Sequence, residues 1–210
     1  MLNNKFSLFF DYVDKGGLIF ILLVFFSVIS LAIIFYKITQ FYSIKTSQLN
    51  IVEKKILETN NQKDLDEIYN MFEIENKPFF DMFNKSIYIL KKKNLREEDK
   101  ISEVSIIVNK EIEKLEKLLP SLDIIAQISP LLGLLGTVIG MISSFNQLEL
   151  GGKTVDPSVL AGGIWTALLT TAVGLIVAIP ALISNHFFEK KIQEFQTEVN
   201  SILVLIKNKT

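Results

Sequence analysis

Charged residues are absent from three long stretches of the chain, and apolar residues dominate these stretches. They are residues 16–36, 124–148 and 157–188. A helix of about 20 consecutive apolar residues crosses the hydrocarbon core of a bilayer. The pattern therefore predicts an all-α membrane protein with three transmembrane helices, at residues 16–37, 122–148 and 158–188, joined by a short loop at 149–157 and extended by long cytoplasmic helices.

The first apolar stretch lies near the N-terminus, where a cleaved secretory signal is the competing interpretation. Its apolar run from Leu18 to Tyr36 is longer than a signal core of about 7–15 residues, and no small-residue cleavage site follows it. We therefore predict a retained transmembrane helix. Residues 1–15 mix aromatic residues with Asp11, Asp14 and Lys15. Two interpretations stay open for them, a short interfacial segment at headgroup level or a partly disordered terminus.

The region from residue 38 to residue 121 is polar and helical in pattern. Its last part has apolar residues at steps of three or four, which predicts an amphipathic helix ending at Pro120: Ile101, Val104, Val108, Ile112, Leu115 and Leu119. Further helices are expected from about Phe41 to Asn60, from Asp64 to Glu73 and from Pro78 to Lys92. Residues 189–210 are expected to continue the third transmembrane helix and to pack on the middle region through Phe195, Val199, Ile202 and Ile206.

Basic residues indicate the orientation of the chain in its membrane. Fifteen of the 22 Lys and Arg residues fall within residues 37–121, and four more follow the third span, whereas the 149–157 loop contains only Lys153. Cytoplasmic segments carry the excess of Lys and Arg. We therefore expect the middle region and the C-terminus in the cytoplasm, and the N-terminus and the short loop on the outer side.

Composition then removes several classes of function. The net charge is −1, so no overall basic field attracts nucleic acid. The chain has no Cys and one His, His186 near the end of the third span, which removes disulfides and multi-His metal sites. It also lacks a phosphate-binding loop and a credible Ser-His-Asp set. We therefore expect neither an enzyme nor a protein with a metal or a cofactor.

Small residues recur along one face of each of the second and third spans. In lipid, small residues let helix backbones approach closely. Tight helix packing therefore explains the following positions: Gly133, Gly136, Gly140, Gly163, Ala167, Gly174, Ala178 and Ala181. Pro130 and Pro180 each remove a backbone hydrogen bond and are expected to bend their helices.

Hydroxyl side chains accompany these small residues, and packing explains them less well. Two interpretations stay open on chemistry alone: the hydroxyls hydrogen-bond to carbonyls of their own helix, or they line a polar path. They are Thr137, Ser143, Thr166, Thr170 and Thr171. No Asp, Glu, Lys or Arg lies inside a span, and a proton relay needs a titratable group at depth. If this chain conducts ions by protonation, a second protein must supply the carboxylate.

The segments "IAQISPLLGLLGTVIGMISSF" and "GGIWTALLTTAVGLIVAIPALISN" resemble the signature spans of the ExbB/TolQ/MotA proton-channel family, closest to its ExbB and TolQ branch. The resemblance also includes the first span, and it covers about 120 of the 210 residues. It implies a homo-oligomeric ring in the bacterial inner membrane, typically a pentamer. The ring would surround a dimer of an ExbD- or TolR-like single-span subunit that carries one essential Asp.

The resemblance also implies site residues and a function. Thr137 and Thr171 would face the partner Asp and donate hydrogen bonds to it, with Ser143, Thr166 and Thr170 as further pore or cation contacts. Proton flow would drive rotation of partner against ring and do work on an envelope process, through a TonB- or TolA-like protein. Thr166 stands where ExbB and TolQ usually have a Glu. A sodium-driven motor and a non-conducting ring scaffold are the alternatives.

Overall fold

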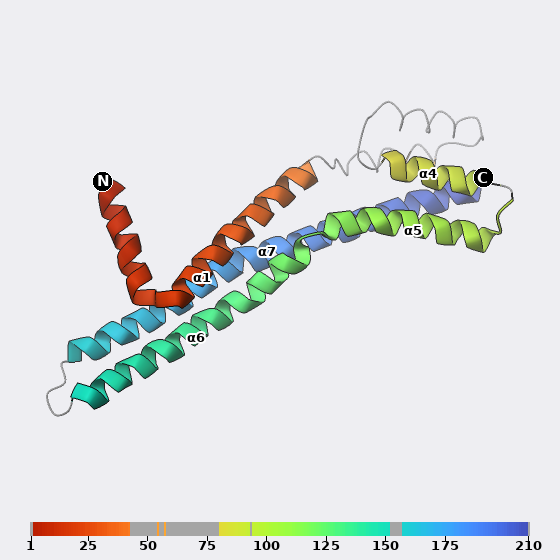
Figure 1. Cartoon of the computed structure of the whole chain (residues 1–210). Helices are drawn as coiled ribbons and strands as arrows, with labels where there is room; N and C mark the ends of the chain where they lie inside the picture. The colour runs from red at the N-terminus through yellow and green to blue at the C-terminus, as the bar shows by residue number, and fades with distance from the viewer. Residues whose placement is uncertain are drawn as a thin grey trace. The chain divides into compact units, whose positions relative to one another are not determined.

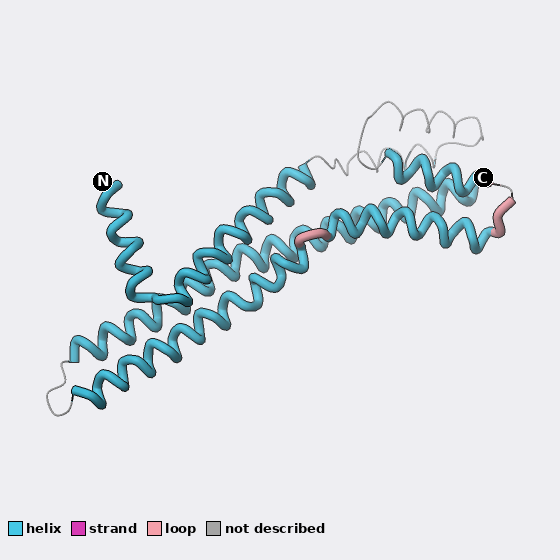
Figure 2. The backbone as a smooth tube through the Cα atoms, in the orientation of Figure 1, coloured by secondary structure: helices cyan, strands magenta, loops and turns pink. Residues whose placement is uncertain are grey.

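The computed structural model describes residues 2–42, 54, 57, 80–92, 94–151 and 157–209, and the elements it defines there are helices. They are α1 (Leu2–Tyr42), α4 (Phe80–Lys91), α5 (Glu97–Glu116), α6 (Leu119–Gly151) and α7 (Pro157–Lys209), drawn in Figures 1 and 2. The predicted all-α class is confirmed. The chain divides into two compact units. The first comprises Met1–Ile38 and Leu118–Phe187, and the second comprises Thr39–Lys117 and Phe188–Thr210.

Three helices are long and apolar enough to cross a membrane. These candidate spans are Gly16–Tyr42, Leu119–Leu150 and Leu160–Lys207. The first has the highest mean hydropathy, 3.2, and the other two have 1.8 and 2.2, because small and hydroxyl residues replace bulky apolar ones there. The prediction of three apolar spans is confirmed, and the chain is a membrane protein.

A kink at Gly17 separates the N-terminal part of α1 from its membrane-spanning part. Gly17 has φ 59° and ψ −155°, and Figure 1 shows the chain changing direction there. This combination of angles is essentially restricted to glycine. Residues 2–16 therefore form a helical segment of their own, whose direction is set by this one residue. The described backbone of residues 2–16 is helical, and the predicted location of this segment at headgroup level stays a prediction.

The core of the first unit joins α1, α6 and α7. It is built from buried Ile33 of α1, then Leu122, Ile125 and Ala126 of α6, and finally Val177 and Ala181 of α7. Partly buried residues surround these six: Phe26, Ile29, Ile34 and Val173. Because Ala126 and Ala181 add little bulk, the three helices pack closely at this level. Many other apolar side chains of these helices remain exposed in the single chain, as expected of surfaces that face lipid or another protein.

The second unit packs the C-terminal part of α7 with α4 and α5. The predicted stripe of Phe195, Val199, Ile202 and Ile206 is fully buried, as are the α5 residues Val104, Val108, Ile112 and Leu115. Near the start of this unit Phe41 stacks on Phe188 with ring centroids 5.3 Å apart. Ile101 is the exception to the predicted stripe, since it is 46% exposed in the first turns of α5.

The amphipathic helix ends earlier than its predicted end at Pro120. α5 stops at Glu116, and Leu118 adopts φ 74°, which breaks the helical path. Pro120 lies instead in the first turn of α6. A proline is well tolerated there, because the first turn of a helix needs no backbone N–H from it. The proline therefore marks the beginning of the next helix.

Of the other helices expected in the middle region, only the last falls on described residues. It was expected from Pro78 to Lys92, and α4 covers Phe80–Lys91. The helices expected from Phe41 to Asn60 and from Asp64 to Glu73 lie almost entirely outside the described residues. The continuation of the third span into residues 189–210 is present, since α7 runs unbroken to Lys209.

Candidate functional site at the seam of α6 and α7

The small residues of α6 and α7 lie against each other along an antiparallel seam. A Cβ atom added to Gly133 would lie 2.9 Å from the Cα of Thr171, and one added to Gly174 would lie 2.6 Å from the carbonyl oxygen of Ser129. Both neighbours are backbone atoms, which cannot move aside alone. The seam therefore depends on glycine at these two positions, and the two backbones approach as closely as small residues permit.

The seam continues from this point toward the loop that joins the two helices. A Cβ on Gly136 would overlap the side chain of Thr170, and one on Gly140 would lie 3.1 Å from the Cβ of Ala167. Further along, a Cβ on Gly163 would overlap the hydroxyl of Ser144. Ala178 lies on the other side of Gly174 and is buried as well. Each predicted packing position therefore faces a neighbour within the chain or is buried.

The seam residue that the sequence analysis missed is Ser144. Ser144 is buried and donates a hydrogen bond to the carbonyl of Gly140 at 2.9 Å, whereas the neighbouring Ser143 is exposed. The signal was present in the sequence, because Ser144 follows Gly140 by four residues and so continues the face formed by Gly133, Gly136 and Gly140. Ser143 lies off that face.

Thr171 crosses the seam. Its Oγ1 donates to the carbonyl of Gly133 at 3.1 Å. Thr170 is 1% exposed, and its Oγ1 lies 2.8 Å from the carbonyl of Ala167 and 3.4 Å from that of Gly133. The carbonyl of Gly133 is therefore a shared acceptor for α7, and it fixes the register of the two helices at this level.

Thr137 lies one helical turn beyond Gly133 on the same face of α6. Its Oγ1 donates to the carbonyl of Leu134 at 2.6 Å. A turn rises about 5.4 Å, so Thr137 lies about one turn nearer the connecting loop than Gly133, the residue that Thr171 faces. Both side chains are half-buried, and each keeps part of its surface exposed. Both threonines therefore lie on the seam, about one turn apart along its length, and their predicted role stays a prediction.

The other hydroxyls lie closer to the connecting loop. Thr166 is half-buried and donates to the carbonyl of Gly162 at 2.9 Å, and it lies beside Ala167, which faces Gly140. Ser143 lies near the level of Gly163, more than two turns from Thr171. Of the two interpretations of the hydroxyls, bonding to carbonyls of their own helix describes Thr137, Thr166 and Thr170, whereas Thr171 donates across the seam to the other helix. Thr137, Thr166 and Thr171 also retain exposed surface.

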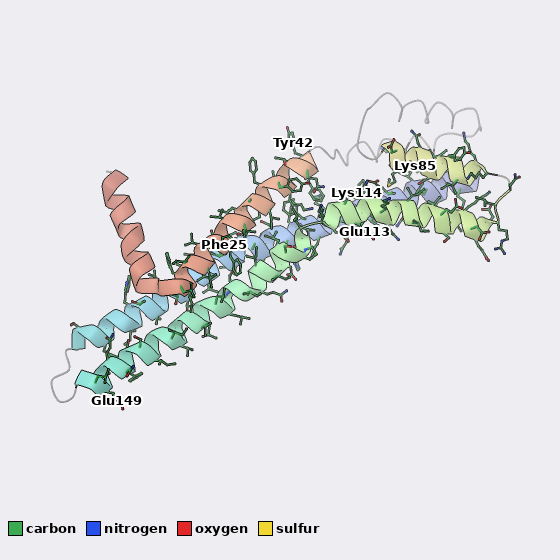
Figure 3. All side chains as sticks on the ribbon, in the orientation of Figure 1. Phe25, Tyr42, Lys85, Glu113, Lys114 and Glu149 are labelled. Atoms are coloured by element: carbon green, nitrogen blue, oxygen red, sulfur yellow. The ribbon has the colours of Figure 1, made fainter. Side chains whose placement is uncertain are left out.

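No metal-binding cluster of three or more His, Cys, Asp or Glu side chains occurs among the described residues. The ionisable groups nearest the second span are at its ends: Asp123, which accepts a hydrogen bond from Gln127 at 2.7 Å, and Glu149 on the last turns of α6 (Figure 3). Pro130 and Pro180 lie inside α6 and α7, which continue through them. The predicted bends stay a prediction.

Lys37 is the charged residue whose position the sequence did not predict. Its side chain is 0% exposed, although a lysine at the end of an apolar stretch is expected to reach toward the headgroups. Asn185 of α7 is also buried within the first unit. The sequence around Lys37 and Asn185 does not show whether these polar residues are buried or lie at the membrane interface.

Comparison with known proteins identifies the family. Residues 48–201 match the model of the MotA/TolQ/ExbB proton channel family. The chain is 34% identical over 100 residues to the Tol-Pal system protein TolQ of Haemophilus influenzae, a match that covers 48% of this chain and 43% of that protein. It is 49% identical over 61 residues to the biopolymer transport protein exbB1 of Vibrio cholerae, covering 29% and 27% of the two chains.

A third similar protein is the putative biopolymer transport protein ExbB-like 1 of Synechocystis, 50% identical over 64 residues, 30% of this chain and 25% of that one. The matched segments thus span between a quarter and a little over two fifths of these relatives. The family model, in contrast, covers most of this chain. Together with three apolar helices and a hydroxyl-bearing seam, the match shows that the chain belongs to the MotA/TolQ/ExbB proton channel family.

Proposed function

We propose that this chain is the ring-forming ion-channel subunit of a motor of the ExbB–ExbD or TolQ–TolR kind in the bacterial inner membrane. A homo-oligomer, typically a pentamer, encloses a dimer of a single-span ExbD- or TolR-like subunit whose transmembrane segment carries one Asp. Proton motive force drives the partner against the ring, and a TonB- or TolA-like protein transmits the work to an envelope process. The N-terminus is periplasmic and the C-terminus is cytoplasmic.

The observation that carries this proposal is that Thr137 and Thr171 lie about one turn apart on a seam whose described residues include no ionisable group. The charge-free stretches 124–148 and 157–185 flank both threonines on their helices. A proton relay across a bilayer needs a titratable group at depth. Hydroxyl groups without a carboxylate therefore do not form a complete proton path. Family membership supports a second subunit as the source of the carboxylate.

The energetics of such a motor are modest. One elementary charge crossing 100 mV releases about 2.3 kcal/mol. This is several times the thermal energy and is enough to bias a conformational step. A charged carboxylate at mid-membrane costs about 3 kcal/mol or more. A neutral carboxyl does not carry this cost, so protonation and deprotonation of the partner Asp couple ion flow to its position in the ring.

The orientation follows from the distribution of basic residues. The second unit contains α4, α5 and the C-terminal part of α7, and it also contains most of the Lys and Arg residues. The excess of Lys and Arg marks the cytoplasmic side. The loop between α6 and α7 has only Lys153, which supports its exposure to the periplasm.

Reconstitution with the native partner tests the proposal. A C-terminal tag is placed on the chain, and the single-span protein that copurifies from native membranes is identified. Vesicles that contain the complex are given a membrane potential, and internal pH is followed with a fluorescent dye in sodium-free buffer. Thr171→Val is compared with Thr197→Val, since Thr197 lies on the same helix, is exposed and donates to the carbonyl of Gln193 at 2.9 Å outside the membrane.

We expect the wild-type complex and Thr197→Val to take up protons, Thr171→Val to lose most of the uptake while still copurifying with its partner, and Thr171→Ser to be affected less. Vesicles that contain this chain without its partner should take up no protons. Uptake by the chain alone, or full uptake by Thr171→Val, would refute the assignment. Dependence of the flux on sodium would establish the sodium-driven alternative. A stable complex without any flux would establish the scaffold, consistent with Thr166 in place of the usual Glu.

A further inference from the structure

Each hydroxyl group of the seam lies within hydrogen-bond distance of a backbone carbonyl, to which it can donate its one hydrogen. Thr137 donates to Leu134 at 2.6 Å, Thr166 to Gly162 at 2.9 Å, and Thr171 across the seam to Gly133 at 3.1 Å. Thr170 and Ser144 donate in the same way. Each of these acceptors is a backbone carbonyl. The family resemblance implies that Thr137 and Thr171 donate to a carboxylate, whereas the acceptors within reach of these hydroxyls in the chain are backbone carbonyls.

A hydroxyl has a single hydrogen to donate and two lone pairs that accept. After donating to a carbonyl, Thr137 and Thr171 can offer only their lone pairs to a third group. The described seam is therefore rich in acceptors and poor in donors.

Other donors on the two helices lie away from this level. Ser143 is six residues from Thr137, and Trp165 is six residues from Thr171. Six residues correspond to about 9 Å of helix rise, which is beyond hydrogen-bond reach. The charged or titratable groups nearest the seam lie at the ends of the spans: Lys37 on α1, Asp123 and Glu149 on α6, and His186 on α7. At the level of Thr137 and Thr171, the described spans contain no charged group.

We propose that Thr137 and Thr171 act as hydrogen-bond acceptors toward a protonated carboxyl group, so that this part of the wall holds the acidic side chain of the partner in its neutral form. This inference rests on the proposed function. A protonated carboxyl has one O–H to donate, whereas a carboxylate only accepts and finds no matching donor here. The wall therefore raises the pKa of the partner carboxyl, and deprotonation must take place where the carboxyl leaves these two threonines.

A hydrophobic carbodiimide reads out the protonation state directly, because it modifies protonated carboxyl groups in apolar surroundings. The complex purified from native membranes is treated with dicyclohexylcarbodiimide over a range of pH, and modification of the partner span is quantified by mass spectrometry. The variants are Thr171→Val and Thr137→Val, which keep the shape of the side chain and remove both donor and acceptor. Thr197→Val is the matched control.

An accepting wall predicts that both valine variants move the labelling midpoint to lower pH by about half to one unit, as expected for the loss of one hydrogen bond to the neutral form. Thr197→Val should leave the midpoint unchanged. A shift to higher pH would show that the threonines donate to a carboxylate, and an unchanged midpoint would show that they do not contact the carboxyl. If sodium chloride but not choline chloride protected the partner carboxyl from modification, the lone pairs of the two threonines would be assigned to binding a metal cation. Each of these three results overturns the inference.

The test separates this inference from the proposed function. If no acidic single-span protein copurifies, or if its carboxyl is never modified, the proposed function fails. If the carboxyl is modified and the valine variants shift the midpoint in the wrong direction, the channel remains and only the accepting role of the threonines is lost.

Discussion

Gly174 offers the sharpest test of the α6–α7 seam, because a single methyl group placed there collides with the backbone of α6. In Gly174→Ala the new Cβ would lie 2.6 Å from the carbonyl oxygen of Ser129 and 3.2 Å from the Cα of Gly133. Neither atom belongs to a flexible side chain. The helices must separate by several tenths of an ångström, and the hydrogen bond from Thr171 to Gly133 lengthens with them.

The magnitude is the difference between two terms. Overpacking a close contact costs about 1–3 kcal/mol. Replacing glycine by alanine inside a helix recovers about 1 kcal/mol of backbone propensity. Gly162→Ala is the matched control, since a Cβ on Gly162 meets nothing within 4 Å and lies on the same helix. The propensity term is shared by both variants, so the difference in their free energies of unfolding isolates the overpacking term.

Thermal unfolding of the purified protein in detergent, followed by far-UV circular dichroism, measures this difference. For a chain of this size, 1 kcal/mol corresponds to about 2–4 °C in Tm. We therefore expect Gly174→Ala to unfold about 2–12 °C below Gly162→Ala, and Gly162→Ala to equal or slightly exceed the wild type. Equal Tm values for the two alanine variants would refute the close backbone contact at Gly174.

Three further predictions concern other parts of the chain, all measured as Tm by circular dichroism. Gly17→Ala places a side chain at φ 59° and should cost about 1–3 kcal/mol; an unchanged Tm would contradict the kink. Phe195→Ala removes a ring that is 2% exposed and should lower the free energy of unfolding by about 3–5 kcal/mol. Val204→Ala, at a residue that is 56% exposed, should change Tm little. Equal effects of the two substitutions would show that Phe195 lies outside the core. The hydrogen bond from Lys100 lowers the pKa of Glu97, so its stabilising contribution is present above the unfolded pKa and is lost as pH falls through the folded pKa. Glu97→Gln should therefore show a smaller loss of Tm on acidification than the wild type. An equal fall of Tm with decreasing pH in the two proteins would show that Glu97 makes no such contribution.

Much of the architecture was predictable from the pattern of apolar and charged residues. Charge-free stretches longer than a bilayer crossing predict spans, and apolar steps of three or four predict the buried stripes of α5 and α7. Phe195, Val199, Ile202 and Ile206 were predicted in this way and are buried. Ile101 was predicted in the same way and is 46% exposed.

The sequence also indicated which residue types form the seam but not their partners. A periodic face of small residues shows that some helix approaches closely, and it does not show which one or in what register. The pairing of Gly133 with Thr171 and of Gly163 with Ser144 depends on the antiparallel alignment of two helices. For the same reason Ser143 was favoured over Ser144, although one turn of helix separates Ser144 from Gly140.

The sequence by itself predicted three apolar helices long enough to cross a membrane, each built around a charge-free stretch, with Thr137 and Thr171 among their polar positions. These features are local, because they depend on hydropathy and on spacing along one helix. Only the tertiary structure decided that Thr171 donates across the seam to Gly133 and that Lys37 is buried. Hydrogen-bond direction and burial depend on atoms of other segments, which spacing along one helix does not specify.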